Sequence, residues 1–228
     1  SSFGETHSTI GEPFWNVDRT RFSSTTLTTG GDEFVVRNRF DFEGGTIVGS
    51  NITFAGPLNW TGGTMNLGGR ATVAAGSTAT ISSGTLNSLL INEGRINLTG
   101  TLSGSNPATI ENTTTGTIDL QGNVGFGTFG GEARLENAGL LVKSALTGTS
   151  NVDAFVDNTG TIRVDVGTIN LRGGSRIGGA TDGPGILQLA TSFGETHSTV
   201  GEPAWNVAHT RFSVSTLTAS GDQLTFPN

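Results

Sequence analysis

The sequence has no cysteine, few basic residues and no long hydrophobic run. The lack of cysteine excludes disulfides, zinc–thiolate sites and thiol chemistry. Lysine occurs once, at Lys143, and the formal net charge is −7. Nucleic acids and anionic membrane surfaces are bound through clusters of basic side chains, so neither is expected as a partner. No apolar run approaches the ~18 residues that a membrane-spanning helix needs, so membrane insertion is not expected.

Glycine is abundant, at 36 of 228 residues, and the apolar residues lie between polar ones in short runs. In Thr117-Ile118-Asp119-Leu120, for example, alternation places Ile118 and Leu120 on one face of a strand. Such runs are four or five residues long, and no stretch shows the spacing of an amphipathic helix. The pattern predicts an all-β chain without substantial helix.

A segment near the start recurs 190 residues later. Residues 2–9 are repeated without change at 192–199, and the similarity continues to residue 32. Residues 1–190 are therefore interpreted as one full tandem unit, and 191–228 as the start of the next. Within the unit we expect a junction segment over 1–33 and repeated coils over 34–190. Tandem copies predict a longer, repetitive parent protein whose further copies are its main partners.

A shorter repeat lies inside this unit. Four segments share an asparagine, a following glycine and then alternating apolar residues, and their glycines are 22, 23 and 21 residues apart. Glycine is expected to supply a positive φ at the turn, and the asparagines are expected to stack as a ladder of side-chain amides. The residues of this predicted turn ladder are Asn92, Gly94, Asn112, Gly116, Asn137, Gly139, Asn158 and Gly160.

A repeat of about 22 residues has the size of one coil of a parallel β-solenoid. One coil cannot bury its own apolar face, but stacked coils form a continuous apolar column. With strands about 4.8 Å apart, the 190-residue unit should advance about 40 Å along the axis. An antiparallel sandwich or barrel, which also has short alternating strands, is the alternative.

Segments such as 156–164 and 167–171 resemble the degenerate β-strand repeats of bacterial surface proteins. These are the β-helical adhesins related to filamentous haemagglutinin, and autotransporter passenger domains. The resemblance covers roughly residues 45–190. It implies a right-handed parallel β-helix that serves as an extracellular or cell-surface stalk, filament or adhesive surface. It provides no catalytic residues.

The repeated segment offers the nearest approach to a metal site. Glu5 and His7, which recur as Glu195 and His197, are weak candidates, because residues two apart on a strand share a face. Capping of a turn is the alternative role. The same segment carries the junction aromatics, which are expected to pack at a change of shape or to stack on a sugar ring. They are Phe3, Trp15, Phe22, Phe193, Trp205 and Phe212. Trp60 lies outside this set, in a predicted irregular turn.

Three carboxylates, Glu111, Glu136 and Asp157, each precede a ladder asparagine. Stacking of coils would align them into an acidic rank, either solvated or binding calcium. No other cofactor and no catalytic group is predicted. The sequence thus indicates a structural or adhesive element, not an enzyme, with a cell-surface glycan as a second possible partner. A carbohydrate-binding or carbohydrate-cleaving β-helix is the alternative.

Overall fold

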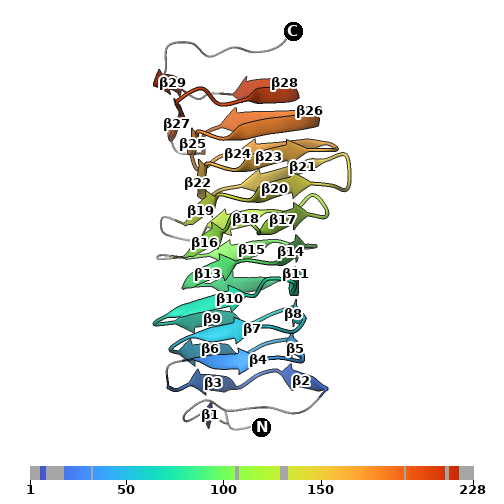
Figure 1. The fold of residues 1–228 in the computed structure, drawn as a ribbon, viewed down its shortest axis with the longest axis vertical. Coiled ribbons are helices and arrows are strands. Elements are labelled where there is room, and N and C mark those ends of the chain that lie inside the picture. The colour runs from blue at the N-terminus through green and yellow to red at the C-terminus, as the bar shows by residue number, and fades with distance from the viewer. Residues whose placement is uncertain are drawn as a thin grey trace.

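The computed structural model describes residues 6–8, 18–31, 33–105, 108–128, 133–192, 194–213 and 216–220. The chain winds into a rod, and the first and last described strands lie at opposite ends of the long axis (Figure 1). All pairings between the named strands are parallel, which confirms the solenoid and excludes the antiparallel sandwich. About ten turns of about 20 residues each make up the rod, slightly fewer residues than the predicted 22.

Each coil contributes one strand to each of three faces. Face 1 and face 2 belong to one 19-stranded sheet, which is continuous because β26 and β28 span both, and face 3 is a separate ten-stranded sheet. Face 1 consists of β2 (Arg19–Phe22), β5 (Arg39–Phe42), β8 (Leu58–Trp60), β11 (Thr78–Ile81), β14 (Arg95–Leu98), β17 (Thr117–Leu120), β20 (Leu140–Lys143), β23 (Thr161–Val164) and the first parts of β26 (Ala180–Ala190) and β28 (Trp205–Ser213).

Faces 2 and 3 follow in chain order. Face 2 consists of β1 (Thr6–Ser8), β3 (Thr26–Thr29), β6 (Thr46–Gly49), β9 (Thr64–Leu67), β12 (Gly84–Leu86), β15 (Leu102–Gly104), β18 (Phe126–Thr128), β21 (Thr149–Val152), β24 (Thr168–Leu171) and the second parts of β26 and β28. Face 3 consists of β4 (Phe34–Val36), β7 (Ile52–Phe54), β10 (Arg70–Val73), β13 (Leu89–Asn92), β16 (Thr109–Asn112), β19 (Arg134–Asn137), β22 (Phe155–Asn158), β25 (Ser175–Ile177), β27 (Thr196–Val200) and β29 (Thr216–Ser220).

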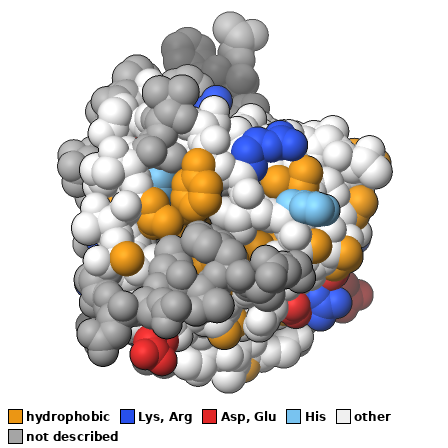
Figure 2. All heavy atoms as spheres, turned by 90° about the horizontal axis from the view of Figure 1, so that it is seen from above, with side chains coloured by type: hydrophobic (Ala, Val, Ile, Leu, Met, Phe, Trp, Pro, Cys, Tyr) orange, Lys and Arg blue, Asp and Glu red, His pale blue; other side chains and the backbone are white. Residues whose placement is uncertain are grey.

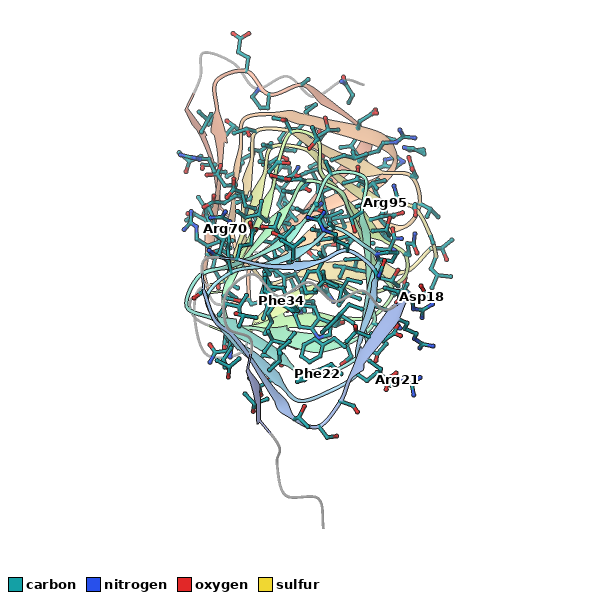
Figure 3. All side chains as sticks on the ribbon, turned by 60° about the horizontal axis from the view of Figure 1, so that its bottom comes forward. Asp18, Arg21, Phe22, Phe34, Arg70 and Arg95 are labelled. Atoms are coloured by element: carbon teal, nitrogen blue, oxygen red, sulfur yellow. The ribbon has the colours of Figure 1, made fainter. Side chains whose placement is uncertain are left out.

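The hydrophobic core is a column inside the coils, as the alternation predicts. In β17 the inward Ile118 and Leu120 are both buried, and they stack on Ile96 and Leu98 of the coil before. In an oblique view with the N-terminal end forward, Phe22 and Phe34 lie within the coil while Arg21 points outward (Figure 3). Each fully buried aliphatic or aromatic side chain contributes about 1.5–3 kcal/mol, so the column supplies the main stabilisation.

Trp60 corrects the prediction of an irregular turn. It ends strand β8 with its side chain fully buried, and its ring stacks on Phe42 at 5.6 Å between centroids. Its indole nitrogen donates to the Gly62 carbonyl at 2.9 Å. Gly62 and Gly63, which follow it closely, suggested a turn. In the next coil Gly84 leaves room for the indole ring, because a Cβ there would lie 2.4 Å from it.

The described parts of 1–33 and 191–223 form coils too. Strands β2 and β3 pair with β5 and β6, and β27 and β28 continue the faces that β25 and β26 define. The repeated segment therefore extends the solenoid at both ends of the chain. Within the described part there is no apolar helix long enough to cross a bilayer.

Candidate functional site

The asparagines of the short repeat form a ladder inside the solenoid. Each ends a strand of face 3 and is no more than 1% exposed, and the first three each donate the side-chain amide to the side-chain oxygen of the next asparagine. The three bonds join Asn92 to Asn112 at 2.7 Å, Asn112 to Asn137 at 2.7 Å and Asn137 to Asn158 at 2.6 Å. In a dry interior such bonds polarise one another, so the ladder stabilises the stacking register.

A second set of bonds ties the ladder to the turns. Asn92 also donates to the Thr117 carbonyl at 3.1 Å, Asn112 to Leu140 at 3.2 Å and Asn137 to Thr161 at 3.1 Å. Each acceptor begins the face 1 strand of the coil above. The ladder therefore fixes the corner between face 3 and face 1 as well as the distance between coils.

The glycines of the motif act differently from the prediction. None of Gly94, Gly116, Gly139 and Gly160 has a positive φ, so that part of the prediction is wrong. Their role is to allow close approach. A Cβ at Gly139 would lie 2.2 Å from the Thr113 carbonyl oxygen, and one at Gly160 would lie 2.2 Å from the Gly139 oxygen. Only glycine lets the corner backbone pack so closely on the coil below.

The ladder has an unsatisfied end. The side-chain oxygen of Asn92 is buried and has no hydrogen-bond donor, since Val73 lies opposite Asn92 in the preceding coil. At the other end Asn158 donates to the Gly160 carbonyl at 3.2 Å. The ladder is therefore polar along its length, with one orphan acceptor at the N-terminal end.

The three carboxylates before the asparagines are aligned on the outside of face 3. Glu111 lies opposite Glu136, which lies opposite Asp157, and Arg176 follows in the next coil. Arg176 forms an ion pair with Asp157, and Arg134 lies 3.7 Å from Glu136 and packs over the Phe155 ring. The rank is thus interleaved with guanidinium groups. Among the described residues no three acidic or histidine groups are arranged to hold a metal ion.

A buried carboxylate on face 1 was not singled out from the sequence. Asp41 is fully buried beneath Arg19 and Arg39, with Arg39 Nε at 2.9 Å, and Asn59 donates to it at 3.2 Å. Burial by itself would raise the pKa of Asp41, but the hydrogen bonds from Arg19, Arg39 and Asn59 hold that pKa below its ordinary value. The Arg–x–Asp spacing in β5 was the available signal.

Lys143 lies in the apolar column, a position that was not predicted for it. It is fully buried between Leu120 and Val164 of the adjoining coils, and its ammonium donates to the carbonyls of Gly122 at 2.5 Å and Ala145 at 2.9 Å. Burial lowers the pKa of Lys143. The alternation Leu141-Val142-Lys143 was the signal, because it assigns Lys143 to the inward face.

Of the weak metal candidates, Glu195 and His197 have described side chains. His197 is fully buried, with Nδ1 2.9 Å from the Ser175 hydroxyl and Nε2 2.8 Å from the Ala190 carbonyl, so both ring nitrogens are occupied. Burial lowers the pKa of His197. Glu195 accepts hydrogen bonds from Thr191 and from the Ser192 backbone nitrogen, as a turn cap does. Glu5 lies outside the described residues, and His7 is described by its backbone only.

The junction aromatics are core residues where they are described. Phe22 packs against Phe40 and Phe42 at 6.4 and 5.9 Å, and Trp205 is buried with its indole nitrogen bonded to Thr210. Phe212 differs, since it is 45% exposed at the C-terminal end. Phe3, Trp15 and Phe193 lie outside the described residues.

Comparisons with known proteins give no relative. No protein-family model, no curated protein and no solved structure matches the chain.

Proposed function

We propose that this chain is a structural module of a repetitive extracellular protein, in which tandem units join into a stalk or filament with an adhesive outer surface. The observation that carries the proposal is the placement of the long repeat. Strand β1 pairs with β3 through Thr6↔Thr26, and β27 pairs with β29 through Thr196↔Thr216, so both copies make the same internal pairing. A repeat that is itself coiled extends the rod instead of interrupting it.

The arrangement of side chains suits a stiff rod. Three parallel ladders run from one end of the described chain to the other, and the asparagine ladder adds an internal line of hydrogen bonds. The outside is largely Thr, Ser, Asn and paired charges, which offers polar groups to water or to a surface glycan. A strand edge left bare would pair with foreign strands, whereas a following unit would cover it.

The length of multi-unit chains tests this proposal. Chains with one, two and three units are compared. At each junction residue 222 of one copy is joined to residue 33 of the next copy, so that the repeated segment occurs only once there. In small-angle scattering, the maximum dimension should rise linearly by about 45 Å per unit, from the ~4.8 Å spacing of strands. Growth with the square root of unit number would show flexibly linked beads and overturn the stalk.

A binding measurement separates the adhesive part of the proposal from the structural part. Beads coated with the three-unit chain should adhere to glycan-bearing surfaces more strongly than beads coated with the single unit, because linked sites gain avidity. If both kinds of bead adhered only at the background level, the adhesive role would be excluded and the proposed stalk function would stand.

A further inference from the structure

The 190-residue repeat does not contain a whole number of coils. Strand β3, which starts at Thr26, lies on face 2, whereas β29, which starts 190 residues later at Thr216, lies on face 3. Along face 3, β29 lies nine coils after β4. Strand β3 lies on face 2, the face that the chain visits directly before it reaches β4. One repeat therefore spans nine coils and one further face.

The other two strands of the repeat show the same shift. Arg21 in β2 lies opposite Asp41 on face 1, but its equivalent Arg211 lies opposite Gln188 on face 2. Strand β1 belongs to face 2, and its equivalent β27 pairs with β25 on face 3. The same sequence thus occupies successive faces at the two ends of the chain.

The C-terminal end of the rod is the surface on which the next unit would lie. Hydrophobic, arginine and histidine side chains gather there, as the view onto this end shows (Figure 2). Phe212 is 45% exposed, whereas its equivalent Phe22 is 6% exposed beneath Phe40 and Phe42 of the following coil. Likewise Arg21 Nε lies 3.0 Å from Glu43 of that coil, and Arg211 has no ion pair within the described part.

These differences identify what would cover the end. A coil with the sequence of residues 34–49 places Phe40, Phe42 and Glu43 over Phe22 and Arg21 in the first copy. Residues 192–222 repeat residues 2–32, and in the first copy this segment is followed directly by the coil that begins at Phe34. Leu224-Thr225-Phe226 does not repeat Phe34-Val35-Val36, so the covering coil is assigned from the order of the repeat. The occupant is therefore a following copy of the same repeat.

We propose that successive repeats continue one solenoid and that each is displaced by one face around the axis relative to the unit before it. This inference rests on the proposed stalk function and specifies its geometry. A surface carried on face 1 in one unit would lie on the side of face 2 in the next, and three units would present it in all three directions. An adhesive patch would thereby face every side of the fibre, at axial intervals of about 45 Å.

Paired labels on a two-unit chain test the displacement. Asn66 is exposed on face 2, and the chain has no cysteine, so Asn66→Cys introduces one thiol per unit. Each thiol is biotinylated and then marked with streptavidin. Electron microscopy should show the two labels on different sides of one straight rod. In a matched variant, Asn66→Cys in the first unit is combined with Thr80→Cys, on face 1, in the second. These two labels should lie on the same side.

The outcomes separate this inference from the proposed function. A straight rod with both Asn66→Cys labels on the same side would overturn the displacement and leave the stalk standing. Two rods joined at an angle would overturn both. Labels on different sides in the first variant and on the same side in the matched variant would support both.

A disulfide test in the unmodified length of chain checks the assignment of the second copy to face 3. Arg176 and Ser198 are paired in register, so the variant Arg176→Cys/Ser198→Cys places its thiols within disulfide range. The control Gln188→Cys/Ser198→Cys pairs residues on different faces. The first pair should oxidise and the control should not. The reverse result would overturn the displacement.

Discussion

Asn112 donates its side-chain amide to the oxygen of Asn137 at 2.7 Å, although 25 residues separate them. The separation is longer than the 20 residues between Asn92 and Asn112, yet the hydrogen bond has the same length. Extra residues in a coil are thus accommodated outside the ladder, which keeps the register of the interior constant.

Breaking the ladder at its middle should destabilise the rod strongly. Asn112→Ala would leave the Asn92 amide without its acceptor and the Asn137 oxygen without its donor, at about 1–3 kcal/mol for each buried group. We expect a loss of about 2–5 kcal/mol in the free energy of unfolding, measured with denaturant. Asn66→Ala, at an exposed site, is the control and should change it by less than about 0.5 kcal/mol. Equal effects of the two would contradict a stabilising ladder.

A new asparagine should be tolerated at the end of the ladder but not at an equivalent inward position away from it. Val73→Asn would supply a donor to the orphan oxygen of Asn92, whereas Val36→Asn, on the same inward column, has no asparagine to meet. We expect Val73→Asn to be more stable than Val36→Asn by about 1–3 kcal/mol in denaturant unfolding. A crystal structure of the first variant should show the new amide within hydrogen-bond distance of Asn92.

The corner glycines should not accept even a methyl group. Gly139→Ala would force a Cβ to within 2.2 Å of the Thr113 oxygen, so we expect a loss of about 1–3 kcal/mol or more. Gly127→Ala is the matched control, since its nearest atom would lie at 3.6 Å and its φ is not positive. Melting temperatures of the two variants decide the point. If Gly139→Ala melts no earlier than Gly127→Ala, close approach is not what selects glycine.

Alkaline pH should stabilise the protein through a single side chain. The pKa of Lys143 is lowered from 10.5 by burial, so between the lowered pKa and 10.5 the unfolded chain binds more protons than the folded one. Stability therefore rises with pH across this window. The chain has no tyrosine, no cysteine and no other lysine, so only the α-amino group, with a pKa of about 8, titrates close to this window.

The variant Lys143→Met isolates this effect. Methionine fits the apolar column between Leu120 and Val164 and does not titrate, so its unfolding free energy should be flat from about pH 9 to 11. The measurement is denaturant unfolding at stepped pH for both proteins. Parallel pH profiles of the two would show that Lys143 is not the titrating group.

Several features could be predicted because they depend on neighbours in the sequence. The alternation around Ile118 and Leu120 defines an inward and an outward face, since strand geometry has a period of two. The recurrence of Asn92, Asn112, Asn137 and Asn158 at coil-like intervals then predicts that their side chains stack. Neither inference needs knowledge of what lies in the adjoining coil.

The remaining features depend on contacts between coils, which the sequence alone does not specify. Gly139 is required by a carbonyl of the coil below, Trp60 is buried by Phe42 of another coil, and Arg176 lies beside Asp157 through lateral pairing. The sequence by itself determined the 190-residue repeat and the alternation that builds the apolar column, and it favoured parallel winding over an antiparallel sandwich. Only the tertiary structure decided that the unit ends one face further around the axis, because that offset is the sum of coil lengths that vary from turn to turn.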